Sequence, residues 1–171
     1  LYTLAERYDE DPRVRDLVDA YDLWIVPVVS PDGFAARSRE VGGVDPNREF
    51  PYPEDPDRRP IPVIDAAVRF FEAHRFAGTL DFHAFGELVL LPYGASFDRP
   101  PTWTALSDVA RDLAAVGGYE PVQISTLFGG LAIGGSVDYY LWRGRGIHLA
   151  VEMATSKAPP TSEIPALRRH G

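Results

Sequence analysis

Residues 79–94, TLDFHAFGELVLLPYG, constrain the fold of this chain more than any other stretch. Residues 79–82 are rich in β-prone side chains, and residues 87–91 are almost wholly apolar. We predict two strands, separated by a break at residues 84–86 and closed by Pro92-Tyr93-Gly94. A short strand that is apolar throughout is typical of a sheet covered on both faces. The stretch therefore predicts a layered protein with a central sheet.

The rest of the chain supplies the helices and further strands that such a sheet needs. Apolar residues at helical spacing predict helices at residues 1–8, 12–21, 61–74, 101–116 and 136–142. Ser136 is expected to cap the last of these helices. Apolar runs predict strands at residues 23–29, 121–125 and 146–153, and Ser30-Pro31-Asp32-Gly33 predicts a turn. The alternation predicts one α/β domain over residues 1–171, with a mixed parallel and antiparallel sheet and helices on both faces.

Composition excludes several classes of partner. The formal net charge is −8 and the basic residues are not clustered, which argues against nucleic acid as a partner. The chain has no cysteine, so disulfides and thiolate metal sites are excluded. No run of 18 apolar residues predicts a membrane span, and the first residues do not have the pattern of a signal peptide.

His83 stands where the first strand of the central stretch ends. The carboxyl ends of strands form the edge at which open α/β sheets build their sites. A histidine there is suited to metal binding or to acid–base catalysis, and a buried histidine with a satisfied ring is the alternative.

Four separated motifs resemble those of the zinc metallocarboxypeptidases of carboxypeptidase A and B type. They are Ser30-Pro31-Asp32-Gly33, residues 43–50 (GVDPNREF), the stretch beginning at His83, and Gly134-Gly135-Ser136-Val137-Asp138 followed by Glu152. The family's patterns read roughly as N-P-D-G, G-V-D-x-N-R-N-[FW], H-S-Y-x₅-P-Y-G and G-[GS]-S-x-D, with a last strand that ends in E-L. The resemblance covers essentially the whole chain and implies a phosphorylase/hydrolase-like three-layer α/β/α sandwich, here truncated.

The resemblance also implies a set of site residues. Carboxypeptidase A holds zinc with two histidines and a glutamate, and His83 matches one of these ligands. Glu152 matches the general base that takes a proton from the attacking water. Asn47 and Arg48 match the pair that binds the C-terminal carboxylate of a substrate peptide.

Two further assignments concern the substrate. An arginine of the preceding loop stabilises the oxyanion in the family, and Arg37 and Arg39 both compete for that role. We favour Arg39, because its spacing to the Gly-Val-Asp motif needs only one deletion. Val137 stands where an acidic residue would select Lys or Arg, so we expect a preference for apolar or aromatic C-terminal residues.

Several departures qualify the resemblance. The family's H-x-x-E motif, which supplies the other two zinc ligands, is absent, because none of the four histidines has a glutamate three residues later. We therefore expect a fragment whose two missing ligands lie upstream of Leu1, and which is inactive alone. The family's long C-terminal helix is also missing. Gly130 or Phe128 stands in place of the substrate-capping tyrosine. Ala84-Phe85 replaces Ser-Tyr, Pro46 precedes Asn47, and Glu49 replaces Asn.

Three functions remain open at this stage. The first is a zinc-dependent carboxypeptidase acting on the C-termini of peptides or proteins. The second is a non-catalytic binding domain of the same fold, and the third is a related zinc amidohydrolase of acyl-amino acids. The family slightly favours a secreted or extracellular location. We further expect non-proline cis peptide bonds at Ala84-Phe85 and Pro92-Tyr93, and the site residues gathered in one cleft at the carboxyl edge of the sheet.

Overall fold

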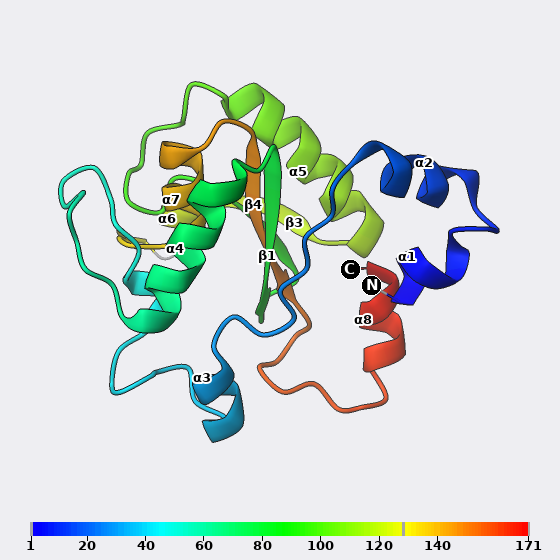
Figure 1. Ribbon diagram of the computed structural model, residues 1–171, viewed down its shortest axis with the longest axis horizontal. Coiled ribbons are helices and arrows are strands. Elements are labelled where there is room, and N and C mark those ends of the chain that lie inside the picture. The colour runs from blue at the N-terminus through cyan, green and yellow to red at the C-terminus, as the bar shows by residue number, and fades with distance from the viewer. Residues whose placement is uncertain (1, 128, 171) are drawn as a thin grey trace.

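The computed structural model describes residues 2–127 and 129–170 as a sheet flanked by helices (Figure 1). The strands are β1 (Gly78–Ala84), β2 (Leu88–Leu91), β3 (Glu120–Gln123) and β4 (Ile147–Met153). The helices are α1 (Tyr2–Arg7), α2 (Pro12–Ala20), α3 (Pro31–Ala36), the 3₁₀ turn η1 (Pro46–Arg48), α4 (Pro62–His74), α5 (Trp103–Gly117), α6 (Ile124–Leu127), α7 (Ser136–Arg143) and α8 (Ile164–His170).

The sheet is mixed, as predicted, with the strand order β1-β4-β2-β3. β4 pairs with β1 in parallel and with β2 antiparallel, while β3 runs parallel to β2. In the β1–β4 ladder His83 lies opposite Glu152. Because side chains alternate between the faces of a strand, this register places both residues on the same face.

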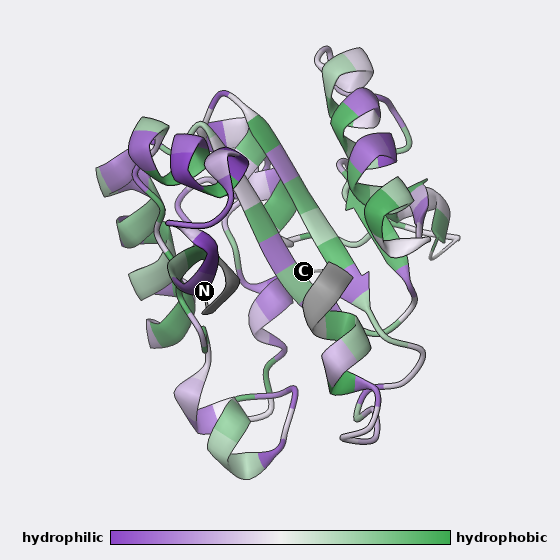
Figure 2. Cartoon of the chain, turned by 90° about the vertical axis from the view of Figure 1, so that its right-hand side faces the viewer, coloured by the Kyte–Doolittle hydropathy of each residue, from purple (hydrophilic) through white to green (hydrophobic). Residues whose placement is uncertain are grey.

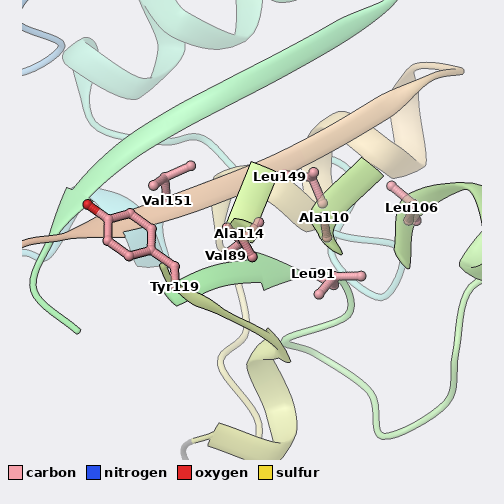
Figure 3. Packing of buried hydrophobic residues seen from close by; sticks show 8 residues of the cluster. All are labelled: Val89, Leu91, Leu106, Ala110, Ala114, Tyr119, Leu149 and Val151. Atoms are coloured by element: carbon pink, nitrogen blue, oxygen red, sulfur yellow. The ribbon is translucent and has the colours of Figure 1, made fainter. Parts of the chain in front are cut away.

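Helices cover both faces of the sheet, which confirms the predicted layering. On one face α5 packs mainly over β2, β3 and β4. Its core contains eight buried residues that lie between helix and sheet (Figure 3), namely Val89, Leu91, Leu106, Ala110, Ala114, Tyr119, Leu149 and Val151. On the other face, Val137 of α7 packs against Leu90 and Ala150. There α4 joins α7 through a cluster of aromatic rings that includes Phe71 and Tyr139.

The outermost strand β1 is only partly covered. Leu80 and Phe82 face the same side as the α5 core, yet they are 45% and 50% exposed. Figure 2 shows apolar segments along the long central strands, facing the viewer between the helices at either side. β1 is an edge strand in the described part of the chain, and it pairs there with β4 alone.

Residues 23–29 correct one prediction, because this apolar segment is irregular, with bends at Pro27 and Val29, and does not form a strand. All seven side chains are exposed, and within the described ranges no strand pairs with the segment. A segment without a neighbouring strand has no ladder to join. Trp24 instead packs on α4, with its ring 5.6 Å from that of Phe70 and 4.2 Å from that of His74.

Two further local predictions are wrong in detail. Residues 30–33 begin helix α3, because the Ser30 hydroxyl accepts a hydrogen bond from the amide of Gly33 and Pro31 occupies the first turn. The end of the predicted strand at residues 121–125 lies in α6. The predicted helices at residues 12–21, 61–74 and 101–116 are confirmed, each within two residues at either end.

The peptide bonds Ala84-Phe85 and Pro92-Tyr93 are both cis, as predicted.

No described helix is long and apolar enough to cross a membrane.

His148 on β4 is fully buried on the face covered by α7. Its Nδ1 lies 3.1 Å from the Thr79 hydroxyl, and the rings of Phe71 and Tyr140 lie beside it. Its Nε2 is buried without a hydrogen-bond partner among the described residues. Burial lowers the pKa of this imidazole from 6.5 to about 4. His148 is therefore a neutral core histidine.

We predict that His148 makes the fold sensitive to mild acid. The unfolded chain binds a proton near pH 6.5 and the folded chain only near pH 4, so this contribution to stability is complete above pH 6.5 and falls as the pH drops towards 4. The loss amounts to about 3 kcal/mol. Urea unfolding between pH 7 and pH 4 should show a shallower pH dependence in His148→Asn than in the wild type. Substitution of the exposed His74 by Asn is the control, and an unchanged slope in His148→Asn would contradict the prediction.

Candidate active site

A row of polar side chains crosses the face of the sheet beneath α7. Thr79, Asp81 and His83 alternate along β1 on this face, and their partners on β4 are His148, Ala150 and Glu152. The row changes from a buried end at His148 to a half-buried end at His83 and Glu152, next to the carboxyl edge of the sheet. The strand period of two thus brings together residues that are 69 positions apart.

The loop containing η1 is joined to the beginning of α7. The Asn47 side-chain oxygen accepts a hydrogen bond from the backbone amide of Ser136 at 2.8 Å, and the amide of Phe50 donates to the carbonyl of Gly134. Gly134 has φ +75°, and a Cβ there would lie 2.4 Å from the carbonyl oxygen of Arg48. Only glycine permits this close approach.

These segments surround one cavity, and six predicted site residues lie in its wall. They are Arg39, Asn47, Arg48, His83, Val137 and Glu152. Arg37 is not among the lining residues. It ends α3 in a left-handed conformation and is exposed, so the geometry favours Arg39 over Arg37. The apolar part of the wall consists of Leu90, Ile124, Ala132, Val137 and Ala150.

His83 and Glu152 carry shifted pKa values. Burial opposes the charge on His83, but the hydrogen bond and the negative charge of Asp81 outweigh it, and the pKa of His83 is raised. The Nε2 of His83 lies 3.1 Å from Oδ2 of Asp81. Burial raises the pKa of Glu152, and the charges of His83 and Arg39 oppose that rise. Glu152 Oε2 is buried and has no hydrogen-bond partner among the described residues. Such a carboxylate in a cleft is a candidate proton acceptor.

Arg39 is positioned by a carboxylate that also holds the loop. Its Nε donates to Oδ2 of Asp45 at 2.8 Å, and Oδ1 of Asp45 accepts from the amide of Asn47 at 3.0 Å. The Arg48 guanidinium donates to the carbonyl of Asn47 at 2.6 Å. Each arginine keeps further N–H groups for an anionic ligand, since a guanidinium has five donors.

Asp81, Asp45 and Asp138 were not among the site residues predicted from the sequence. Asp81 stands two residues before His83, so the strand period could have placed it on the same face. Ser136 was expected to cap α7, but the N-cap is Gly135 without a side-chain bond, and the Ser136 hydroxyl donates to Asp81 Oδ2. Asp138 lies in the first turn of α7, and its contacts depend on tertiary structure.

The described residues do not complete a metal site. Over residues 2–127 and 129–170, no three His, Cys, Asp or Glu side chains gather closely enough to hold a metal ion. A catalytic zinc needs three protein ligands. His83 fits one such ligand, because its ring reaches the cavity and its other nitrogen is already bonded to a carboxylate.

Gly130 or Phe128 stands where the family has its capping tyrosine, and the structure describes only one of these two residues. Gly130 lies in the loop before α7 and offers no side chain, while Phe128 lies outside the described residues.

Comparisons with known proteins agree with the resemblance seen in the sequence. The family model described as zinc carboxypeptidase matches residues 1–170. Metallocarboxypeptidase A of Trichophyton tonsurans is 28% identical over 148 residues, which cover 66% of this chain and 35% of that protein. Carboxypeptidase A2 of Rattus norvegicus is 27% identical over 142 residues, which cover 65% of this chain and 34% of that protein.

Solved structures show the same fold. Thrombin activatable fibrinolysis inhibitor superposes with a TM-score of 0.83 at 19% identity, over 98% of this chain and 53% of the other. Carboxypeptidase A from Helicoverpa armigera gives a TM-score of 0.70 at 20% identity, over 85% of this chain and 48% of the other. The chain thus spans about a third of the length of the curated relatives and about half of these two structures.

Asp138 is predicted to anchor the loop after β2 to α7. Its carboxylate accepts hydrogen bonds from the amides of Gly94 and Ala95 at 2.7–3.0 Å and is buried. Asp138→Ala leaves these amides unbonded, so it should lower the free energy of unfolding by about 2–4 kcal/mol. Asp138→Asn, which retains an acceptor oxygen, should cost less. In urea unfolding, Asp65→Ala removes an exposed ion pair with Arg69 as the control. An equal effect of Asp138→Ala and the control would contradict this role.

Proposed function

Because this chain belongs to the zinc carboxypeptidase family, we propose that the protein carrying it hydrolyses the last peptide bond of peptides or proteins with the help of zinc. The observation that carries the proposal is the gathering of Arg39, Asn47, Arg48, His83 and Glu152 around one cavity. An exopeptidase needs a group that binds the free carboxylate and a base close to the scissile bond. Both are available in this cavity.

Asn47 and Arg48 are assigned to the terminal carboxylate. Asn47 uses its oxygen to hold Ser136, so its side-chain NH₂ remains as the donor for a ligand. The planar guanidinium of Arg48 matches a carboxylate through two parallel hydrogen bonds. Together they place the chain end of a substrate at the bottom of the cavity.

Glu152 and Arg39 are assigned to the reacting bond. The raised pKa of Glu152 favours its action as a general base towards water, and the base then returns the proton to the leaving amine. Arg39 has its Nε bonded to Asp45, which leaves its terminal N–H groups for the carbonyl oxygen as negative charge develops. Zinc, when bound with His83 as one ligand, would act as a Lewis acid at this oxygen.

The apolar wall suggests the preferred side chain. Val137 is 3% exposed and lies with Leu90, Ile124 and Ala132 around the cavity. Two acidic residues line the cavity besides this apolar wall. Glu152 is assigned to the reacting bond, and the carboxylate of Asp138 is bonded to two backbone amides. We therefore assign the site to apolar or aromatic C-terminal residues.

The test is peptide hydrolysis by the longest form of the protein that carries this chain. Blocked dipeptides ending in Phe, Leu, Lys or Glu should be cleaved in favour of Phe and Leu. Glu152→Gln should lower kcat by about 10²–10⁴-fold with a small change in KM, because a general base contributes to the chemical step. Glu87→Gln, an exposed position between β1 and β2, is the matched control. Binding of the peptides without hydrolysis by the wild type would contradict the enzymatic function and favour a binding domain.

A second prediction concerns the 171 residues alone. One imidazole does not hold zinc tightly, so we expect weak zinc binding and no peptidase activity from this chain. Calorimetric titration measures the affinity directly, with His83→Ala as the comparison. Submicromolar binding that is lost in His83→Ala would show that the chain contains ligands beyond those assigned.

A further inference from the structure

The ring of His83 is held through one nitrogen. Nε2 lies 3.1 Å from Oδ2 of Asp81, which stands two residues earlier on the same face of β1. Among the described residues no hydrogen bond is recorded for Nδ1, while the side chain lines the cavity. The two ring nitrogens differ, and the bond made by one decides which of them carries the proton.

Asp81 is itself held by a hydrogen bond from the first residue of α7. The Ser136 hydroxyl donates to the same Oδ2 that faces His83, and the Ser136 amide donates to Asn47. Asp81 retains only 24% side-chain exposure. A carboxylate held by two partners cannot change rotamer without breaking a bond, so the distance between Asp81 and His83 is set by α7.

From this geometry we infer that Asp81 is a positioning residue, which fixes neutral His83 as the tautomer protonated at Nε2 and leaves the lone pair of Nδ1 for the cavity. Ser136 supports Asp81 in this role. The inference deepens the proposed function and rests on it in one respect, since it names the nitrogen through which His83 would serve as a ligand. Metal-binding histidines commonly donate their other N–H to a carboxylate.

An alternative is that Asp81 and His83 form a plain ion pair that only stabilises β1. Both roles predict a loss of stability in Asp81→Ala. They differ in the state of the neutral ring, because an ion pair needs a charged imidazole, whereas the positioning role sets the tautomer after the charge is lost. The tautomer is therefore the decisive readout.

The first experiment measures histidine ring ¹⁵N shifts in the metal-free protein, in its longest form, at about pH 9, where imidazoles are neutral. We expect wild-type His83 to be protonated at Nε2, and Asp81→Ala to show a mixture of tautomers. Asp81→Asn retains an acceptor oxygen and should restore the wild-type pattern, and Ser136→Ala should shift it partly. Thr79→Val is the matched control, because Thr79 contacts His148 from the same face of β1 and should change the shifts of His148 alone. If Asp81→Ala does not fold, the Asp81→Asn and Ser136→Ala variants carry the test.

The second experiment measures zinc affinity of the same proteins by competition with a chromophoric chelator. Loss of a carboxylate that orients a ligand should weaken binding about 10–100-fold in Asp81→Ala, less in Asp81→Asn, and not at all in Thr79→Val. An unchanged tautomer in Asp81→Ala overturns the inference, whatever the metal does. A changed tautomer with unchanged zinc affinity also overturns the positioning role. If the tautomer changes in Asp81→Ala as expected but the wild-type protein binds no zinc, the inference is supported and the proposed function is overturned.

Discussion

Ser136 makes the two hydrogen bonds on which the geometry of the cavity depends. Its amide donates to Asn47, 89 residues earlier, and its hydroxyl donates to Asp81, 55 residues earlier. One residue at the beginning of α7 therefore joins the loop containing η1 to the edge strand β1. Asp45 extends the network from Asn47 to Arg39, so a single chain of hydrogen bonds runs from the arginine to His83. Such a network holds charged groups in place before any ligand arrives.

The two faces of the sheet carry different kinds of side chain. The α5 face buries aliphatic and aromatic side chains, and its packing provides most of the core. The α7 face carries buried or half-buried ionisable groups, and hydrogen bonds to Asp138 and Asp81 offset part of the cost of burying these two carboxylates. Asp138 accepts from two backbone amides, and Asp81 accepts from Ser136 and His83. Because successive side chains of β1 and β4 point to opposite faces of the sheet, the same two strands contribute apolar residues to one face and ionisable residues to the other.

Much of the fold and of the cavity could be predicted from the sequence, because both rest on local patterns and on motifs. Glu152 and His83 lie at strand ends, and the loop motif contains Asn47 and Arg48, so their meeting followed from topology. The role of Ser136 could not be predicted, because a serine at a helix start normally caps the helix. Its hydroxyl turns to Asp81 only because the sheet passes beneath it. The β propensity of residues 23–29 predicted a strand. A strand also needs a second strand to pair with, and the local sequence pattern does not specify one.

The exposed margin of β1 has a consequence for handling the 171-residue chain. Its outer backbone groups have no ladder in the described structure, and Leu80 and Phe82 on the same strand expose apolar surface. Edge strands of this kind accept strands from other molecules. At high concentration two copies can extend one another's sheets, and the net charge of −8 provides only a screened, salt-dependent repulsion against that growth. Dilute protein at low ionic strength is therefore the condition that least favours pairing of these edges.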